Sequence, residues 1–530
     1  MGTPFHLSVV NGRILPEAQL PSLSISIVLY NSSQWLPGFL KSLDALNYPK
    51  DKLSLFFVDN GSNDQTNTQV QTFKTRAGQY YKSIQHYNRP NLGYGAGNDY
   101  AIRNSLDDFV LVTNVDTLFD KDSLAFAVTA AIHDNERTAS WEFRQQPNEH
   151  PKYYDPVTLS THWSSHACIL IRRSAYLDVG GYETRLFMYG EDVELSYRFR
   201  AHGYRLRYLP KATMTHFVDQ ETTKNRSEQL SGTMAANILL RYKYGSFRDI
   251  LGGETLFRWA HYRQQYKNQK IQFKTAKKII SQNRWHFFKS RKRKLKNTFP
   301  FYQYDYGRIR TEESLKSTAI ETLNQKPLVT MIINIKPDII SQLRCALLSA
   351  LNQTYPNIEY IIAGPQTSKA GSIVREFMNT YKDANIRHLE TESSRKFSSE
   401  NTALKDAKGE YICFIDSDDL LFSDHIETLI NGLLSPKNSF VASYARTWCF
   451  LGACSEAGKI NTKTPSSTLK NFPAKKLFLF SRKLYETYGG LNENDPSLED
   501  DGNDSELWQR YSEGGEFHFI PRVTSITSRK

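Results

Sequence analysis

The chain has 530 residues, of which 39% are hydrophobic and 13% aromatic, enough for about three globular units of roughly 100–200 residues each. No stretch reaches the roughly 18 apolar residues that would span a bilayer, and the start of the chain lacks a secretory signal pattern, so a membrane-spanning or secreted protein is not expected. The five cysteines form no CxxC pair, which indicates reduced thiols in a cytosolic protein without a zinc site, and the formal net charge is +12.

Residues 24–58 predict a strand, a helix and a second strand. SISIVLY and LSLFFV are apolar runs, and WLPGFLKSLDALNYP between them has helical spacing. Strand–helix–strand units with short connections imply a mainly parallel sheet covered by helices, and such sheets bind ligands at the carboxyl ends of their strands. Asp59 directly follows the second strand, so its carboxylate could accept hydrogen bonds from a nucleotide base or ribose. An Asx turn is the alternative interpretation.

Further polar motifs follow along the chain. NLGYGAGN lacks the glycine spacing of a dinucleotide-binding loop, and its glycines are better explained by close passage of the backbone past a ligand. In VTNVDT, Asn114 and Asp116 offer the hard oxygen ligands that Mg or Mn bridging to a diphosphate prefers. Glu191 and Asp192 begin a predicted helix, where they could also serve only to compensate the helix dipole. His216 follows a short strand, and a lone histidine is more often a packed side chain than a ligand.

Residues 258–298 carry the excess of positive charge, with 14 Lys or Arg and no Asp or Glu. Phe273, Ala276, Ile280 and Phe287 recur in this segment at helical spacing, which predicts an amphipathic helix that is aromatic on one face and basic on the other. Such a helix suits an anionic membrane surface. The alternatives are contact with nucleic acid and a solvated linker helix packed on a neighbouring domain.

One plan occurs twice in the chain. Residues 329–363 repeat the strand, helix, Tyr-Pro, strand order of residues 24–58, and EYICFIDSD later ends in acid as DDFVLVTNVD does. Each copy then has a Gly-Gly pair before an acidic cluster, GEDVELSYR in the first and NDSELWQR in the second. We therefore predict an N-terminal extension (1–21), a first α/β domain (22–245), a basic and helical linker (246–325) and a second α/β domain (326–530).

Taken in order, SIVLYN, VDNGSND, NLGYGAGN, NVDT, GGY, GEDVELSYR and ATMTHF resemble the motifs of family 2 glycosyltransferases of the GT-A fold. Within that family they look most like bacterial enzymes that build O-antigen or capsule chains, including rhamnosyltransferases. The resemblance spans residues 22–217, and LLSALNQTYP, AKGEYICFIDSDD and NDSELWQR extend it to residues 326–527. It implies two Rossmann-like GT-A domains and inverting, metal-dependent transfer of a sugar from a dTDP- or UDP-linked donor to a lipid-linked glycan.

The resemblance also implies roles for single residues of the first copy. Asp192 would be the general base, and Asp116 and His216 would bind the divalent cation, Mg or Mn. Asn114 stands where the family has the first Asp of its DxD motif, and it keeps an oxygen ligand. The residues that would hold the nucleotide sugar are Tyr30, Asn31, Asp59, Asn98 and Asn114. Glu191 and Arg198 would support the site or the acceptor.

The second copy keeps part of the pattern. By resemblance its base would be Asp504, its metal ligand Asp418, its donor-binding residues Asn401 and Asp416, and its site support Trp508 and Arg510. It departs from the pattern because Ala363, Gly364 and Pro365 stand where the first copy has Asp59, Asn60 and Gly61, and because no histidine follows Arg522. The second domain is therefore either an active transferase with an altered base pocket or a domain for acceptor binding or assembly.

Two rival functions belong to other classes. A sugar nucleotidyltransferase would need a Gly-rich phosphate loop bearing Lys or Arg near the first strand, and SIVLYNSSQW offers none. A carbohydrate-binding or scaffold protein without activity is the non-enzymatic alternative. We expect a cytoplasmic enzyme, peripheral on the inner face of the cell membrane, with no nucleic acid among its partners.

Overall fold

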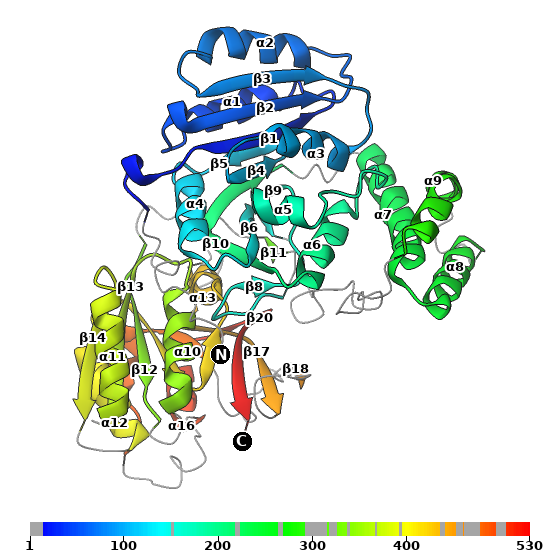
Figure 1. The fold of residues 1–530 in the computed structure, drawn as a ribbon. Helices are drawn as coiled ribbons and strands as arrows, with labels where there is room; N and C mark the ends of the chain where they lie inside the picture. The colour runs from blue at the N-terminus through cyan, green and yellow to red at the C-terminus, as the bar shows by residue number, and fades with distance from the viewer. Residues whose placement is uncertain are drawn as a thin grey trace. The chain divides into compact units, whose positions relative to one another are not determined.

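The computed structural model describes residues 14–149, 153–217, 223–262, 269–291, 315–316, 326–336, 340–365, 368–391, 395–434, 440–451, 459–460, 477–493 and 505–529. The chain divides into two compact units (Figure 1). The first unit contains the described residues up to 154 and from 159 to 291, and the second contains 155–158 and the described residues from 315 onward. The domain boundaries inferred from the sequence stay a prediction, and the basic segment up to residue 291 lies within the first unit.

The first unit is built on one mixed sheet with the strand order β3-β2-β1-β4-β9-β6-β10-β5, and β8 pairs with β10. Its strands are β1 (Leu23–Leu29), β2 (Leu53–Asp59), β3 (Ser83–Asn88), β4 (Phe109–Thr113), β5 (Thr117–Phe119), β6 (Thr138–Gln146), β8 (Ser160–Thr161), β9 (Cys168–Arg172) and β10 (Arg205–His216). The strands β7 (Asn148–Glu149) and β11 (Leu315–Lys316) lie outside the two large sheets.

The sheet is parallel from β3 to β4, and β9 runs antiparallel to both of its neighbours. The predicted α/β class with a mainly parallel sheet is confirmed, and the antiparallel strand β9 makes the sheet a mixed one. The central strand β1 is buried at nearly every position because both of its faces are covered, which is typical of a parallel strand inside such a sheet. Asp59 ends β2 and Asp116 follows β4, as the sequence predicted.

Helices cover this sheet. They are α1 (Leu36–Asp44), α2 (Thr66–Ala77), α3 (Tyr94–Asn104), α4 (Ser123–His133), α5 (Arg173–Asp178) and α6 (Glu191–Ala201). α3 contacts β1 and β2, α4 contacts β6 and β10, and α6 contacts β10. An apolar cluster joins α3, β4, β9 and α6, with Ile102, Val112, Ile169 and Leu195 among its members. This core holds the start of α6 against the sheet, close to the carboxyl ends of its strands.

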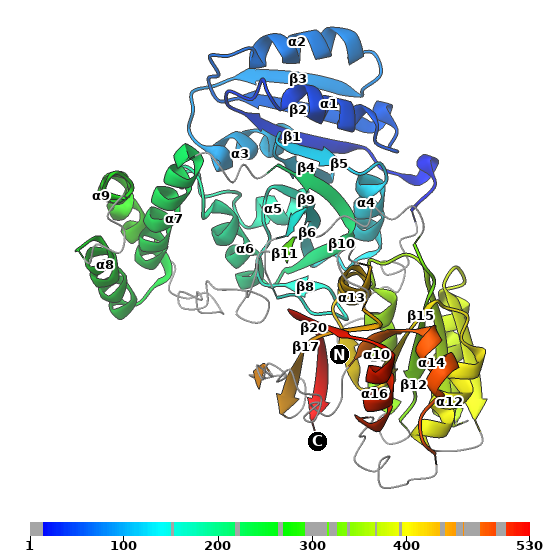
Figure 2. The same ribbon diagram turned by 180° about the vertical axis from the view of Figure 1, so that it is seen from behind.

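Three further helices follow the first sheet: α7 (Thr223–Tyr244), α8 (Phe247–Tyr262) and α9 (Lys270–Lys289). Figure 2 shows them beside α6. The predicted amphipathic helix exists as α9, but its apolar residues Phe273, Ala276, Ile280 and Phe287 are buried and pack within the first unit, mainly against α7. The interpretation as a packed helix therefore holds for this face, and the exposed part of α9 carries its basic residues together with Ile271 and Trp285. In the described part of the chain, no helix is both long and apolar enough to cross a bilayer.

The second unit repeats the first. Its sheet has the order β14-β13-β12-β15-β19-β17-β20-β16, and β18 pairs with β17. The strands are β12 (Val329–Asn334), β13 (Ile358–Pro365), β14 (Asn385–Thr391), β15 (Tyr411–Asp416), β16 (Asp419–Leu421), β17 (Ala442–Leu451), β18 (Lys459–Ile460), β19 (Phe478–Ser481) and β20 (Phe517–Arg529). The helices are α10 (Ile340–Leu351), α11 (Ser368–Thr380), α12 (Lys396–Asp406), α13 (His425–Leu433), α14 (Arg482–Tyr488) and α16 (Ser505–Tyr511).

The register of the two sheets is also the same, which allows residues to be matched between the units. β2 and β13 each pair from their first residue with the first residue of β1 or β12. The seventh residue of each strand therefore occupies the same place, and it is Asp59 in β2 and Gly364 in β13. The sequence comparison placed Ala363 opposite Asp59, and the register corrects this by one residue.

Candidate functional site

The loops after β1 and β2 meet at the carboxyl edge of the first sheet. Asp59 is almost fully buried, and its carboxylate accepts hydrogen bonds from the backbone N–H of Ser62 at 3.1 Å, from the Ser62 hydroxyl and from the Asn67 amide at 2.7 Å. The Ser62 hydroxyl also accepts the backbone N–H of Asn31 at 2.8 Å, while the neighbouring Tyr30 is exposed. The structure thus brings Tyr30, Asn31 and Asp59 together, although they come from different strands.

Asp116 and His216 lie side by side, 100 positions apart in the sequence. The antiparallel pair β5–β10 places His216 opposite Thr117, and the Nε2 atom of His216 is 3.5 Å from Oδ1 of Asp116. Both side chains are partly open to solvent, with 12% and 30% of their surfaces exposed. Asn114, just before Asp116, is also partly exposed, and its carbonyl oxygen accepts the Thr117 hydroxyl at 2.8 Å.

The tautomer of His216 is fixed by a buried neighbour. The Oε1 atom of Gln145, on β6, is 2.8 Å from Nδ1 of His216. An amide oxygen only accepts hydrogen bonds, so Nδ1–H of His216 donates to it, and in the tautomer that carries this single proton Nε2 keeps its lone pair toward Asp116. Two acceptor atoms therefore face one another at 3.5 Å. A carboxylate and a neutral imidazole whose other nitrogen is held by a hydrogen bond fit a divalent cation.

Glu191 and Asp192 begin α6, next to this edge of the sheet. The turn before them needs Gly190, which has φ +106° and whose absent Cβ would lie 2.6 Å from Cβ of Ala236. Burial, and then the charge of Asp192, raise the pKa of Glu191, and Oε2 of Glu191 is buried without a hydrogen-bond partner. Burial also raises the pKa of Asp192, which hydrogen bonds from its own helix and from the Trp163 indole offset only in part.

Tyr94 connects the two halves of the site. Its hydroxyl is buried and donates to the backbone carbonyl of His166 at 2.8 Å. Burial raises the pKa of Tyr94, and the charges of Glu191 and then of Asp116 raise it further. Glu191 at the start of α6 and Asp116 after β4 both lie near enough to Tyr94 to act on its pKa.

Arg198 has a structural role behind the site. Its guanidinium group binds the Glu194 carboxylate and donates to the carbonyl oxygens of Val179 and Gly181. Burial alone would raise the pKa of Glu194, but Arg198 and Lys243 outweigh it and hold that pKa at about 2. The second unit repeats this arrangement: Arg510 binds Glu506 and the carbonyl oxygens of Tyr488 and Gly490. Both arginines fix the Gly-Gly turn to the following helix, so they support the site from behind.

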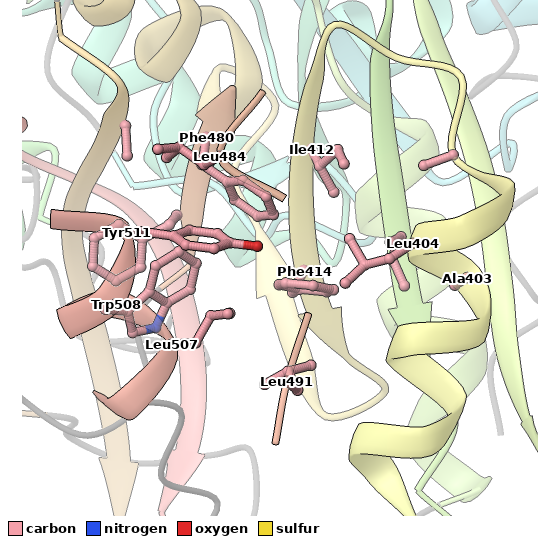
Figure 3. Packing of buried hydrophobic residues seen from close by; sticks show 14 of the residues in the cluster. Ala403, Leu404, Ile412, Phe414, Phe480, Leu484, Leu491, Leu507, Trp508 and Tyr511 are labelled. Carbon is pink, nitrogen blue, oxygen red and sulfur yellow. The ribbon is translucent and has the colours of Figure 1, made fainter. Parts of the chain in front are cut away.

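Three of the proposed site residues have structural contacts, and their roles in the site stay predictions. Asn98 is fully buried, where its amide joins the Ser26 hydroxyl at 2.7 Å to the Tyr94 carbonyl at 3.1 Å, so it holds α3 on β1. Asn401 is bonded through both amide groups to the backbone of Leu491 at 2.8 and 2.9 Å. Trp508 lies in the core of the second unit beside Leu507 and Tyr511 (Figure 3). Its ring stacks on that of Phe478.

The acids of the second unit form one compact cluster. Oxygen atoms of Asp416, Asp418 and Asp419 lie within 4.8 Å of one another, and all three residues are buried. Asp418 precedes β16 as Asp116 precedes β5, so the predicted correspondence between these two acids holds. The cluster also contacts Lys336, whose ammonium group is 2.7 Å from Asp418. Asp504, the proposed base of this unit, lies outside the described residues.

Sequence reasoning missed the residues that adjust the site. Gln145, Trp163, Tyr94 and Lys336 belong to no motif and make their contacts only across strands or loops that the fold brings together. Gln145 lies beside the strand that ends in His216 because β6 and β10 pair in parallel, and this pairing is visible only in the fold. No sequence pattern indicates that the indole of Trp163 lies near Asp192.

Comparisons with known proteins agree with these observations. The model of glycosyl transferase family 2 matches residues 24–193 and 340–452, which together are more than half of the chain. The chain is 27% identical over 255 residues to an N-acetylglucosaminyl-diphospho-decaprenol L-rhamnosyltransferase of Mycobacterium tuberculosis, covering 39% of this chain and 80% of that protein. It is 23% identical over 212 residues to a poly-beta-1,6-N-acetyl-D-glucosamine synthase of Staphylococcus aureus, covering 37% of this chain and 49% of that one.

Among solved structures, the mannosyltransferase PcManGT of Pyrobaculum calidifontis, in complex with GDP-Man and Mn2+, is 18% identical with a TM-score of 0.37, and the match covers 55% of this chain and 80% of that one. The two family matches fall one in each unit, where strands of the same order carry acids at the carboxyl edge of the sheet. The chain therefore belongs to glycosyl transferase family 2, with two GT-A domains in tandem.

Proposed function

We propose that the first unit is an inverting, metal-dependent glycosyltransferase that elongates a lipid-linked bacterial surface polysaccharide, such as an O-antigen or capsule chain. The observation that carries this proposal is the pairing of Asp116 with His216 beside a helix that begins with Glu191 and Asp192. It joins a cation site to a candidate base at the sheet edge where ligands of α/β folds bind. Family 2 membership supports transfer from a nucleotide sugar.

The donor would lie across the carboxyl edge of the first sheet. Asp59 ends β2 and Asn31 follows β1, and a base and ribose would bind beside them. Asp116 lies in the neighbouring loop, after β4. Asp116 and His216 would hold Mg or Mn, which stabilises a leaving diphosphate by its charge. The donors to test first are dTDP- and UDP-linked sugars, including dTDP-rhamnose.

Asp192 would take the proton from an acceptor hydroxyl. The hydroxyl oxygen then forms a bond to the anomeric carbon on the face opposite the diphosphate, the bond from that carbon to the diphosphate oxygen breaks, and the configuration inverts. A base needs a pKa nearer to the working pH than that of an ordinary aspartate, and burial moves Asp192 in this direction. The Trp163 indole acts in the opposite direction and lowers the pKa of Asp192 in part.

The acceptor would be presented by an anionic membrane on its cytoplasmic face. The rhamnosyltransferase relative is named for a polyprenyl-linked acceptor. On α8, Leu251, Leu256, Trp259 and Tyr262 are exposed, and Tyr262 has 89% of its surface exposed. α9 contains no acidic residue, and its lysines and arginine face solvent. Exposed aromatic side chains beside lysines suit the surface of an anionic bilayer.

The test is transfer by the full-length protein. Donor nucleotides are screened with Mn²⁺ or Mg²⁺ and a polyprenyl-diphospho-sugar acceptor, and the product is identified by mass spectrometry. Asp192→Asn is expected to abolish transfer while donor binding persists. Asp108→Asn is the matched control, because Asp108 is exposed and precedes β4 at the opposite end from Asp116. Full transfer by Asp192→Asn would refute the base, and donor binding without any transfer would favour a carbohydrate-binding protein.

A further inference from the structure

The acidic cluster of the second unit already contains a cation of the chain itself. The ammonium group of Lys336 is 2.9 Å from Oδ2 of Asp416 and 2.7 Å from Oδ1 of Asp418. A second ammonium group, that of Lys396 at the start of α12, is 3.3 Å from the other oxygen of Asp416. The carboxylate of Asp419 accepts the backbone N–H of Asp416 at 3.1 Å.

The register shows what this lysine replaces. β1 and β12 begin at matching positions, and the eighth residue counted from each start is Tyr30 in the first unit and Lys336 in the second. The exposed tyrosine ring of the first unit therefore gives way to a charged group that reaches over the acids. Among the described residues of the first unit, Asp116 lies at ion-pair distance from His216 and from no lysine or arginine.

The histidine that would bind the divalent cation in the first unit is replaced as well. The first residue of β5 pairs with His216, and the first residue of β16 pairs with Thr527. In the second unit the Thr527 hydroxyl thus stands where the first unit has the imidazole, and a hydroxyl is a weaker ligand for Mn or Mg. The place of Asp59 belongs to Gly364, which has no side chain to hold a base or ribose.

The positive charge of Lys336 disfavours a metal ion at the same position. A divalent cation needs the oxygen atoms of Asp416 and Asp418, and both residues already bind the ammonium group in charge-assisted hydrogen bonds. An ion placed among these oxygens would also be repelled by the positive charge a few ångströms away. Only 26% of the Lys336 side chain is exposed, so the lysine is held over the cluster and is not a solvated chain that turns away freely.

We propose that Lys336 is a built-in counterion that occupies the divalent-cation position of the second unit. The second GT-A domain then binds no catalytic metal ion and carries out no metal-dependent sugar transfer, and the protein has a single metal centre, in the first unit. The fit of the residues to a cation is good at Asp116 and His216 and poor at Asp418, although the second unit has the more acidic motif.

The experiment counts Mn²⁺ ions bound to the full-length protein, by electron paramagnetic resonance titration with and without UDP. Wild-type protein is expected to bind one ion, Asp418→Ala still one, and Asp116→Ala none. Lys336→Met removes the charge but keeps the alkyl chain. The double variant Asp116→Ala/Lys336→Met is therefore expected to bind one ion again. Adding Asp418→Ala to this double variant should abolish that binding. Lys405→Met, on an exposed lysine of the same unit, is the control and should restore none.

The outcomes separate this proposal from the function of the first unit. Loss of an ion from wild-type protein by Asp418→Ala would overturn the proposal, and so would a folded Lys336→Met variant that gains no site. If that variant does not fold, the comparison of Asp418→Ala with wild-type protein still decides. If the Asp116→Ala variant still binds Mn²⁺ and Asp418→Ala does not change this binding, the metal role of Asp116 is refuted and the role of Lys336 is not affected.

Discussion

Glu191 and Asp192 are adjacent carboxyl groups at the start of a helix, and two effects on their ionisation compete. The helix dipole favours negative charge at this end by about 0.3–1 kcal/mol. Burial opposes the charge, and for both groups the pKa is raised, so the desolvation cost outweighs the dipole. Burial, rather than the helix dipole, therefore dominates the ionisation of the pair, which favours a titrating site over simple charge compensation.

This environment predicts the pH dependence of sugar transfer. Asp192 must be ionised to accept the acceptor proton, and its raised pKa means that protonation begins at a higher pH than for a solvated aspartate. The rate at saturating substrate is expected to fall as pH decreases, with a midpoint above the ordinary aspartate value of about 3.9. A pH profile of kcat measures this, and a midpoint at or below that value would contradict it.

Gln145 is predicted to control metal binding without touching the metal ion. Its amide oxygen holds Nδ1–H of His216, so Gln145→Met frees the ring to turn and to change tautomer. Loss of such an outer hydrogen bond is expected to weaken Mn²⁺ binding about 10- to 100-fold. Mn²⁺ titration of the full-length protein measures the effect, with Gln146→Met, the next residue on β6, as control. Equal affinity in Gln145→Met and wild type would show that His216 is held by other contacts.

At the scale of elements, both units use one device to fix the turn before the acidic helix. Arg198 joins α6 to the Gly-Gly turn through Glu194 and two carbonyl oxygens, and it is almost fully buried. Arg198→Met would leave Glu194 buried with half of its compensating charge, which costs about 3–5 kcal/mol for a buried pair. We expect a fall of this size in the unfolding free energy of the first unit, measured by native-state hydrogen exchange of β9 and α6.

The second unit supplies the comparison. Arg510→Met removes the matching arginine, but 29% of the Arg510 side chain and 36% of the Glu506 side chain are exposed. Solvent screens this pair, so the loss should be clearly smaller than in the first unit. The double variant Arg198→Met/Glu194→Gln should recover part of the stability, because no unpaired charge stays buried. Equal losses for the two arginines would show that burial does not set the cost.

These elements also show how far the sequence could lead. Strand–helix–strand order, the acids at strand ends and the repeat followed from apolar runs and turn residues, because those patterns are local. The contact of Asp116 with His216 followed only from the family resemblance, since nothing local links residues 100 positions apart. The sequence left the partner of the α9 stripe open, because an apolar helical stripe looks the same whether it faces a lipid or a neighbouring helix. The Lys336 contact depends on side-chain reach across a sheet edge, which no spacing encodes.

At the scale of the whole molecule, charge and exposed apolar surface coincide on two helices. α8 exposes Leu251, Trp259 and Tyr262, and α9 exposes Lys274, Lys277 and Lys278. The packing of the α9 stripe on α7 moves the expected membrane contact from the aromatic face of α9 to the exposed side chains of α8, with the lysines of α9 beside them. Such a surface predicts binding that depends both on anionic lipid and on salt.

Neutralising the three α9 lysines as Lys274→Gln, Lys277→Gln and Lys278→Gln should weaken binding to phosphatidylserine-containing vesicles. Each lysine near such a surface contributes about 1 kcal/mol, so the triple variant is expected to bind roughly a hundredfold more weakly at low salt. The control is a triple variant of exposed lysines elsewhere in the first unit, Lys41→Gln, Lys74→Gln and Lys121→Gln, with the same change in net charge.

Vesicle sedimentation at increasing salt measures both variants beside wild-type protein. If net charge alone drives adsorption, the two triple variants lose affinity equally, and α9 has no special part in it. If the α8–α9 surface is the contact, only the α9 variant loses affinity. Trp259→Ser should then weaken the part of vesicle binding that persists at high salt. An exposed indole contributes to binding by burial in the interface rather than by charge. Wild-type binding that is equally strong on neutral vesicles would contradict an electrostatic contact altogether.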